Sequence, residues 1–439
     1  MNTRNTLDPT WAWAPYQPST ERPWNLPLAA HLYRRAAFGA NWGQLQKAMA
    51  DGPRKTISDL LSPQADVDAF NLTCDEYDRS VGRSESADEL RAWWLRRMIL
   101  TPFPLLEKMT LFWHSHFAVN NTIVKNAAFM QQYAHGLRSQ ALGSFESLLK
   151  DICHDPAMLI SIDAIENRKS HPNDALARTL ITHFTLGPDV AKEEDIQQAA
   201  RAFTGNFVRR GRFLQIEREH DDGSKQLFGR TGRFRDTDII RVLLEQPATS
   251  EYIVRKVYAW LMNEVQPPAP SLIAPLTRSF GKDYSVSKLV ETMLRSNLFF
   301  SESCYRQRIK CPVEYALGIV MGLEGMVSTT HLANELAEQG QNLYHPPTLK
   351  GWPGQKAWIN EATLIQRANL ANALLDNAGP YKGKLKPHTI LAKYDRNTEQ
   401  SETQFLTDLF LQNTVPPGAS ESIEQTLYSI VIRPEFHLA

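Results

Sequence analysis

Residues 172–187, Pro-Asn-Asp-Ala-Leu-Ala-Arg-Thr-Leu-Ile-Thr-His-Phe-Thr-Leu-Gly, carry the clearest helix pattern of the 439-residue chain. The proline at the start suits the first turn of a helix. Leu176, Leu180 and Phe184 recur every four residues and therefore share one face. Gly187 then supplies a C-terminal stop. This stretch predicts an amphipathic helix and sets the fold class.

The same pattern extends outward from this stretch over most of the chain. Further helices are predicted at 88–101, 105–117, 193–204, 238–245, 251–263, 286–295, 312–324, 362–375, 403–412 and 421–432. Residues 206–235 differ, because short alternations of large apolar residues there are split by Asp222-Gly223. This pattern indicates an inserted hairpin.

These patterns predict a mainly α, multi-helix globular protein with a small β-hairpin insertion. We expect four regions along the chain. They are an extended Pro/Trp-rich arm at 1–28, a helical region at 29–205, the β-hairpin insertion at 206–235, and a helical region at 236–439 packed on the same core. The arm is expected to be extended because its prolines remove backbone donors and disfavour helix.

Composition excludes several classes of protein. The 48 Lys+Arg balance the 48 Asp+Glu, and 42% of the residues are hydrophobic. This balance argues against a disordered chain and against a protein that coats nucleic acid. The sequence contains no Gly-rich phosphate-binding loop, which disfavours nucleotide-dependent chemistry. No motif in the sequence identifies a cofactor. The N-terminus lacks the apolar stretch of a signal peptide, and no apolar run is long enough for a transmembrane segment, so we expect a cytoplasmic protein unless another export route applies.

Several motifs, in order, resemble one bacterial family, catalogued as domain of unknown function 1800. They are His31-Leu-Tyr-Arg-Arg-Ala-Ala-Phe-Gly, Lys108-Met-Thr-Leu-Phe-Trp-His-Ser-His-Phe, Asp155-Pro-Ala-Met-Leu, Pro172-Asn-Asp with Ala177-Arg, Phe184-Thr-Leu-Gly, Ala200-Arg-Ala-Phe-Thr-Gly, His220-Asp, Lys310-Cys-Pro-Val-Glu, His345-Pro-Pro-Thr-Leu-Lys-Gly-Trp-Pro-Gly and Pro434-Glu-Phe. The resemblance implies a helical fold and a sulfatase-like partner protein. Where relatives carry acidic and amide residues after Pro172, this chain has Asp174, Ala175, Thr179 and Thr182.

Two groups of residues are candidates for acid–base chemistry. His114 and His116 would share a metal only if the predicted helix ended before them, since residues two apart on a helix point in opposite directions. His220 is a candidate proton-transfer group with Asp221 as its orienting partner and Lys225 nearby; the alternative is a solvated turn. Residues 205–235 hold eight basic and four acidic residues, which favours an anionic ligand or simply a basic surface.

Other candidates have plainer alternatives. Asn173 and Arg178 can bind a substrate, or cap a helix and pair with a neighbouring acid. Lys310 precedes a predicted helix and can meet an anion or solvent. In the proline- and glycine-rich loop from His345, Lys350 and Trp352 can bind a sugar or a partner, or the tryptophan can simply pin the loop to the core.

We therefore predict one polar cleft, formed where distant motifs converge. Its residues would be the catalytic His220, Asp221 and His116, and the substrate-binding Lys225, Lys310, Lys350, Trp352, Asn173 and Arg178. The first hypothesis is an enzyme, for example a hydrolase, that acts on an anionic, sulfated or acidic, carbohydrate-like substrate. A variant places a metal between His116 and His220. The alternative is a non-catalytic helical partner or scaffold that binds a co-expressed protein through its Trp loop and basic hairpin.

Overall fold

Side-chain caps decide where many of the helices begin. The structure is a computed structural model that describes residues 7–63, 67–74, 86–376, 379–412 and 422–439. Asn25, Asn41 and Ser144 each accept a backbone N–H from the first turn of the helix that follows. Each such cap stabilises a helix by about 1 kcal/mol. The local sequence thus specifies where these helices start.

The described residues form a mainly α protein with two small hairpins. The first part of the chain contains α1 (Pro9–Trp13), α2 (Leu26–Ala36), α3 (Trp42–Leu61), α5 (Ala87–Leu100), α6 (Pro104–His116), α7 (Asn121–Val124), α8 (Ala127–Gln140), α9 (Phe145–His154), α10 (Pro156–Ser161), α11 (Ala175–Thr179) and α12 (Glu193–Ala202). After the strands β1 (Asn206–Arg209), β2 (Arg212–Gln215), β3 (Lys225–Leu227) and β4 (Arg230–Gly232) come α13 (Asp236–Leu244), α14 (Pro247–Leu261), α15 (Pro270–Asp283), α16 (Val286–Arg295), α17 (Pro312–Gly322), α18 (Thr329–Glu338), α19 (Glu361–Leu375), α20 (Pro387–Lys393), α21 (Glu399–Phe410) and α22 (Ile423–Val431).

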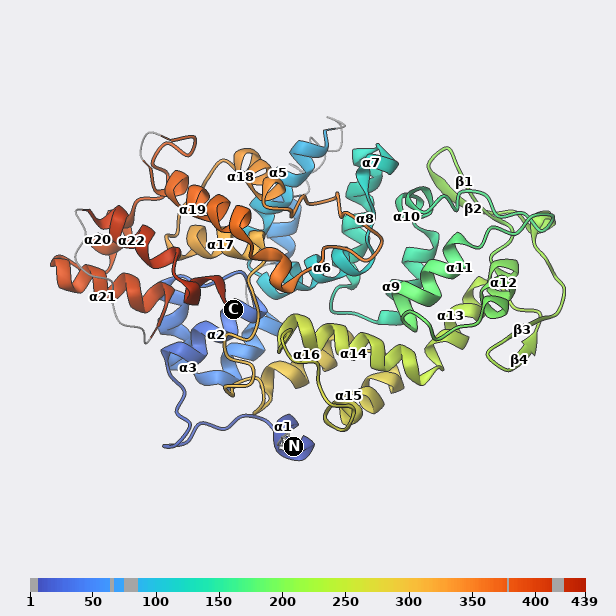
Figure 1. Ribbon diagram of the computed structural model, residues 1–439, viewed down its shortest axis with the longest axis horizontal. Helices are drawn as coiled ribbons and strands as arrows, with labels where there is room; N and C mark the ends of the chain where they lie inside the picture. The colour runs from blue at the N-terminus through green and yellow to red at the C-terminus, as the bar shows by residue number, and fades with distance from the viewer. Residues whose placement is uncertain (1–6, 64–66, 75–85, 377–378, 413–421) are drawn as a thin grey trace.

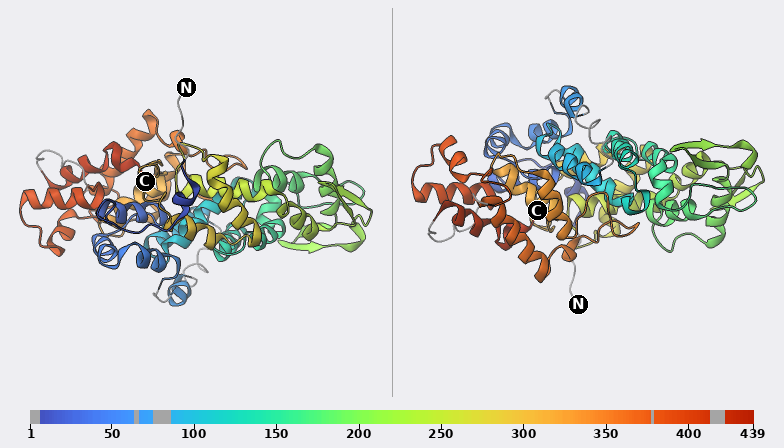
Figure 2. Two further views of the ribbon diagram at one scale, coloured as in Figure 1. Left: turned by 90° about the horizontal axis from the view of Figure 1, so that it is seen from below. Right: turned by 90° about the horizontal axis from the view of Figure 1, so that it is seen from above.

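The molecule is elongated, and its middle is built from helices of both halves of the chain. The hairpins and α9–α13 lie at one end, α19–α22 lie at the other, and α6, α8 and α14 lie between them (Figures 1 and 2). One apolar cluster runs through the buried residues from Ala12 to Phe436. The end of the chain returns to this middle, where the Ala439 N–H donates to the Arg308 carbonyl at 2.8 Å.

The stretch 172–187 is not one regular α-helix, which corrects the sequence prediction. After α11, residues Leu180–Thr185 form a π-helical turn. The Thr185 hydroxyl donates to the Leu180 carbonyl at 2.8 Å, five residues earlier. The predicted apolar face is nevertheless present, because Leu176, Leu180 and Phe184 are all buried. A four-residue apolar repeat does not distinguish an α turn from a wider π turn.

The insertion at 206–235 contains two hairpins, where the sequence analysis predicted one. β1 pairs with β2 and β3 pairs with β4, both antiparallel. Their turns fall at Arg210–Gly211 and Phe228–Gly229, whose residues all have positive φ. The predicted turn at Asp222–Gly223 instead lies in the connection between the two hairpins. Residue–glycine turns with positive φ at both positions match the twist of two-residue hairpins.

The N-terminal arm is also not extended throughout. Asp8 caps the short helix α1, and Pro9 occupies its first turn, where a missing N–H does no harm. The arm lies against the body, since the Trp13 indole donates to the Leu272 carbonyl at 2.6 Å and the Tyr16 N–H donates to the Arg295 carbonyl at 2.7 Å.

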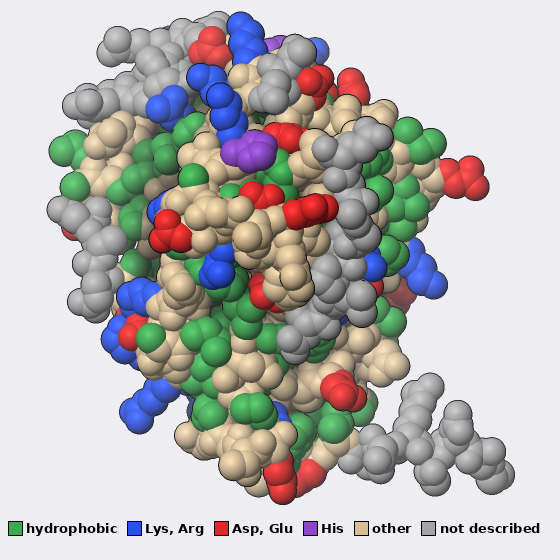
Figure 3. Space-filling view, turned by 90° about the vertical axis from the view of Figure 1, so that its left-hand side faces the viewer, with side chains coloured by type: hydrophobic (Ala, Val, Ile, Leu, Met, Phe, Trp, Pro, Cys, Tyr) green, Lys and Arg blue, Asp and Glu red, His purple; other side chains and the backbone are tan. Residues whose placement is uncertain are grey.

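The end of the molecule formed by the C-terminal helices shows no surface of one charge sign. Figure 3 looks onto this end, where basic and acidic side chains are scattered among apolar ones. None of the helices in the described part of the chain has the length and apolar character needed to cross a membrane.

Candidate functional site

A cavity of about 250 Å³ lies between the end of α6, the helix α14 and the loop at 345–358. We call it the α6–α14 cavity. Its lining combines aromatic and aliphatic side chains with basic and other polar ones. These residues are Leu111, Phe112, Ser115, His116, Lys256, Ala259, Trp260, Glu264, Arg308, Cys311, Gln341, Lys350, Trp352, Pro353, Gly354, Gln355 and Trp358. Three residues predicted from sequence, His116, Lys350 and Trp352, therefore meet here.

Helix α6 continues through His116, so its two histidines face different surroundings. Residues two apart on a helix are rotated by about 200°. His114 stacks on Trp352 with ring centroids 5.4 Å apart, whereas His116 contacts Phe184 and Lys256. Both histidines are buried, with 0% and 3% of their surface exposed. His114 and His116 therefore cannot bind one metal ion together in this geometry.

His116 is held as a neutral ring that accepts from a lysine. Its Nε2 lies 3.2 Å from the Phe184 carbonyl oxygen, which requires a proton on Nε2. Its Nδ1 therefore carries a lone pair, and Lys256 Nζ lies 3.1 Å from it. Burial, with the charge of Lys256, holds the pKa of His116 well below its usual range. Burial also lowers the pKa of Lys256 to about 8.

The π turn ends its helix beside His116 and supplies a backbone carbonyl to it. The last turn of any helix leaves carbonyl oxygens without partners inside the helix. Two of them bond to side chains of other elements: the Phe184 carbonyl bonds to His116, and the His183 carbonyl accepts from the Tyr252 hydroxyl at 3.2 Å. The turn thus joins α6 and α14 on one side of the cavity.

The loop at 345–358 is locked against the end of α6 by a close backbone approach. Gly351 has φ +79°, and a Cβ placed on it would lie 2.1 Å from the Ser115 carbonyl oxygen. Only glycine fits both conditions. The Asn120 side-chain amide donates to the Pro346 carbonyl at 3.0 Å and holds the start of the loop. Trp352 and Trp358 are consequently 8% and 6% exposed, so they pin the loop and also line the cavity.

The far wall of the cavity rests on buried ion pairs. Arg308 Nη1 donates to both carboxylate oxygens of Glu314, at 2.5 and 2.8 Å, and Lys108 bonds to the same carboxylate. Burial alone would raise the pKa of Glu314, but Arg308 and Lys108 outweigh it and hold this pKa well below the usual range. The guanidinium of Arg308 lies 4.2 Å from the centroid of the Trp260 ring, a cation–π contact. Arg308 is thereby fixed in place.

The charges around the cavity are mainly positive. Lys256, Lys350, Arg308 and Glu264 all line it. Glu264 Oε1 accepts the Ile309 N–H at 2.6 Å, and burial raises the pKa of its carboxyl group. Because Glu314 compensates Arg308, the lining keeps two cations, Lys256 and Lys350, against one carboxyl group, and this balance favours an anionic ligand.

The predicted proton-transfer residues lie elsewhere, near the hairpins. His220 Nδ1 lies 2.8 Å from the Thr204 carbonyl oxygen, and Lys225 donates to the carbonyls of Asp221 and Gly223. The carboxylate of Asp221 accepts from Arg201 Nε at 2.7 Å. Arg201 thus takes the place that His220 was predicted to have beside Asp221, which corrects that pairing. We call these residues with Thr204 the His220 cluster.

The contacts of the His220 cluster attach the segment between the hairpins to α12. Two of its donors, His220 and Lys225, bond to backbone carbonyls, and its carboxylate bonds to an arginine. The catalytic role predicted for His220 and Asp221 stays a prediction. These contacts do not fit a metal bound jointly by His116 and His220, since Phe184 and Lys256 engage both ring nitrogens of His116 and Thr204 engages Nδ1 of His220.

Asn173 precedes α11 and Arg178 lies in its last turn, and both join the helix to neighbouring residues. Asn173 accepts the Ala175 N–H at 2.9 Å. Arg178 bonds to Asp174 at 2.6 Å and to both carboxylate oxygens of Glu193 at 2.6 and 2.9 Å. Neither residue lines the α6–α14 cavity. Their contacts are those of a cap and a surface ion-pair network.

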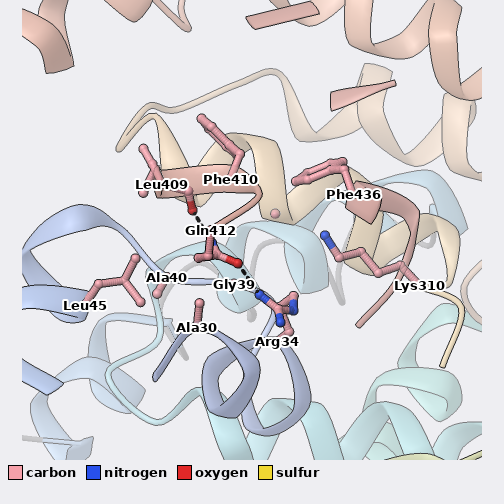
Figure 4. A pocket seen from close by; sticks show the side chains of 11 residues that line it. Ala30, Arg34, Gly39, Ala40, Leu45, Lys310, Leu409, Phe410, Gln412 and Phe436 are labelled. Carbon is pink, nitrogen blue, oxygen red and sulfur yellow. Dashed lines mark hydrogen bonds between the residues drawn. The ribbon is translucent and has the colours of Figure 1, made fainter. Parts of the chain in front are cut away.

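Lys310 lines a different cavity. Although Arg308 and Cys311 line the α6–α14 cavity, the side chain of Lys310 points toward Phe436 and a small cavity beside Arg34 and Gln412 (Figure 4). Alternation along an extended segment accounts for the opposite directions of Lys310 and Cys311, but not for that of Arg308, which is two residues from Lys310. The prediction of a single cleft is therefore corrected: the structure divides the predicted residues among the α6–α14 cavity, the His220 cluster, α11 and the Lys310 cavity.

Sequence reasoning missed Lys256, Glu264, Arg308 and Trp260. One signal was present in helix α14, where Tyr252, Lys256 and Trp260 are spaced by four and place a lysine between two aromatic rings on one face. Glu264 and Arg308 carried no local signal, because they reach the cavity only through tertiary packing. Among the described residues, no group of three or more His, Cys, Asp and Glu is arranged to hold a metal ion.

Comparison with known proteins gives one match. A family model described as a protein of unknown function (DUF1800) matches residues 31–438. No curated protein and no solved structure matches the chain.

Proposed function

Since the chain belongs to the DUF1800 family, whose description assigns no activity, we propose a function from the α6–α14 cavity itself. The cavity binds an anionic, carbohydrate-like molecule, and Lys256 exchanges a proton with it. The observation that carries this proposal is the contact of Lys256 Nζ with the unprotonated Nδ1 of His116 at the cavity wall. His116 acts as the positioning residue, because its other nitrogen is anchored on Phe184.

The chemistry of Lys256 suits a proton donor near neutral pH. A group transfers protons best when its pKa lies close to the working pH, and the pKa of Lys256 is lowered by burial to about 8. Beside an anion, the ammonium form is favoured and carries a proton that it can give to an oxygen of the ligand. The neutral ring of His116 accepts the hydrogen bond that orients the amine.

The walls of the cavity support a ligand with apolar faces and a negative charge. Trp260, Trp352 and Trp358 contribute flat aromatic surface, on which a sugar ring packs well. Lys350 lies on the same loop as Trp352 and adds an exposed cation. A volume of about 250 Å³ lies just below the range of about 300–1,000 Å³ typical of sites for drug-sized molecules, so the cavity suits a ligand no larger than one sugar unit.

The alternative function, a scaffold that binds through the Trp loop and the basic hairpins, receives less support. Trp352 and Trp358 are buried, so their rings are not available to a partner's surface. Arg209, Arg230 and Arg235 form ion pairs with Glu166, Glu245 and Glu217. These pairs neutralise part of the positive charge counted from sequence.

The proposal is tested by calorimetric titration with three probes, glucose 6-sulfate, glucuronate and glucose. We expect the two anionic sugars to bind wild-type protein at least about tenfold more tightly than glucose does. Lys256→Met should remove most of that preference, whereas the exposed control Lys282→Met should keep it. Equal binding of all three probes, or an unchanged preference in Lys256→Met, would refute the proposal.

A further inference from the structure

Two buried cations meet at the small cavity that contains Lys310. The cavity has a volume of about 30 Å³ and lies between α2, α17 and the C-terminal segment. Arg34 and Lys310 line it and are 8% and 4% exposed. Figure 4 shows the two side chains entering this space from different elements, with Gln412 beside Arg34. Buried charges are expensive unless an opposite charge accompanies them.

Neither cation has a side-chain carboxylate bonded to it in the described structure. Arg34 Nη1 donates to Gln412 Oε1 at 2.7 Å, and the Tyr305 ring, whose hydroxyl also acts on the guanidinium, has its centroid 5.5 Å away; Nε and Nη2 meet no acceptor in hydrogen-bonding geometry. Lys310 Nζ lies 3.6 Å from the centroid of the Phe436 ring, a contact that favours a cation but supplies no counter-charge. The nearest acid acting on Lys310, Glu314, is already bonded to Arg308 and Lys108.

The wider neighbourhood has the same imbalance. Its buried cations are Arg34, Arg35, Lys108, Arg308, Lys310 and Arg367. The principal carboxyl groups that act on them are Glu314 and Glu264. Deprotonation of Lys310 would remove one charge, and burial does lower its pKa well below the usual range. Deprotonation near neutral pH cannot remove the charge of Arg34, because burial lowers the pKa of Arg34 only to about 10.

We propose that this cavity binds one small inorganic anion, chloride, between Arg34 and Lys310. A volume of about 30 Å³ suits a single small ion better than sulfate, phosphate or an organic anion. The two N–H groups of Arg34 without acceptors and the Lys310 ammonium supply the donors. The bound ion compensates the buried charge and joins α2 to the segment before α17. This site is separate from the α6–α14 cavity, and its test does not depend on the proposed function.

Two variants separate the anion from general effects of salt. Lys310→Met removes one of the cations. Gly318→Ala keeps every charged group but adds a methyl group at the cavity, where its Cβ would lie 3.8 Å from Lys310 Nζ and 3.5 Å from the Phe436 ring. These are ordinary contact distances, so this variant is expected to fold. Lys282→Met, at an exposed site on α15, is the control.

The thermal unfolding midpoint is measured in sodium chloride and in sodium gluconate at equal ionic strength. Wild type and Lys282→Met should be about 2 °C more stable in saturating chloride, with a single-site dependence on concentration. Both cavity variants should lose this difference. The account is overturned if wild type shows no chloride-specific shift, or if Gly318→Ala and Lys310→Met retain it. The excess ³⁵Cl NMR linewidth of folded wild type, which Gly318→Ala should abolish, gives a direct reading without unfolding.

Discussion

The α6–α14 cavity and the His220 cluster contain the same residue types in different environments. Each contains one histidine and one lysine: His116 and Lys256 in the cavity, and His220 and Lys225 in the cluster. In the His220 cluster, His220 and Lys225 bond to backbone carbonyls, and Asp221 bonds to Arg201. In the cavity, His116 accepts from Lys256, and both residues line open space. Residue type alone therefore does not distinguish the two groups, whereas the partners of each polar atom do.

The comparison predicts that substitutions in the cluster change stability, and that substitutions at the cavity surface change ligand binding. Glu314 lies behind the cavity and holds Arg308 of the cavity wall through a buried ion pair. Its substitution should therefore cause a larger loss of stability than any substitution in the cluster. The predictions that follow run from the largest expected free-energy change to the smallest.

The largest effect is expected for Glu314→Gln. This change leaves Arg308 and Lys108 buried without their shared carboxylate, and breaking a buried pair in this way costs about 3–5 kcal/mol. The free energy of unfolding, measured by urea denaturation, should fall by that amount. A loss below about 1 kcal/mol would show that the cavity wall does not rest on this ion pair.

Lys256→Met should weaken binding of glucose 6-sulfate by about 10- to 100-fold. A hydrogen bond to a charged group contributes about 1.5–3 kcal/mol, and the substituted side chain is similar in length. The thermal midpoint should change little, because the variant no longer has to bury an ammonium group. Weak binding together with a large loss of stability would instead place Lys256 in the same structural class as the His220 cluster.

The pH dependence of binding follows from the same lysine. Its pKa is lowered in the folded protein to about 8, so the ammonium form that attracts an anion is nearly complete below about pH 7, is half lost at about pH 8 and disappears as the pH rises further. Affinity for glucose 6-sulfate should thus be nearly constant from pH 6 to about 7 and decline through pH 8. His116 should add no step near pH 6.5, because its pKa lies well below the usual range. An affinity that falls between pH 6 and 7 would assign the effect to a histidine.

His220→Phe should destabilise the protein by about 1–3 kcal/mol and leave binding unchanged. It removes the donor to the buried Thr204 carbonyl, and an unpaired buried acceptor carries a penalty of this size. Urea denaturation gives the stability, and calorimetry gives the affinity for glucose 6-sulfate. His220→Gln, which keeps a donor, should restore part of the loss. If affinity drops more than tenfold, the cluster belongs to the binding site.

The smallest effect is expected for Arg178→Ala. Its ion pairs with Asp174 and Glu193 are partly exposed, and exposed pairs stabilise by about 1 kcal/mol or less. The midpoint of urea unfolding should move only slightly, and by less at high salt. A change in ligand affinity would revive the substrate-binding role predicted for Arg178 from sequence.

Helices were predictable from sequence where caps, apolar spacing and stops agree, as for α16 at Val286–Arg295. The π turn at Leu180–Thr185 was not, because its apolar spacing is the same as that of an α-helix. The two hairpin turns were missed because Arg210 and Phe228 adopt positive φ, which is uncommon for residues other than glycine.

Residues of the α6–α14 cavity were predictable from sequence only where they belong to a recognisable motif. His116, Lys350 and Trp352 were found because they stand in distinctive segments. Lys256 and Arg308 come from an ordinary amphipathic helix and a short connecting segment. Their roles depend on which elements pack together, and no local pattern encodes that. The prediction of a single cleft was wrong because it assumed that the motif residues converge, whereas tertiary packing decides which of them meet.

The most direct test of the account is the pKa of Lys256, followed by ¹³C NMR of its Cε in the presence and absence of glucose 6-sulfate. The account predicts a pKa near 8 in the free protein and a higher one in the complex, because a bound anion stabilises the ammonium form. An ordinary lysine pKa in the free protein, or one that does not move when the sugar is added, would contradict it.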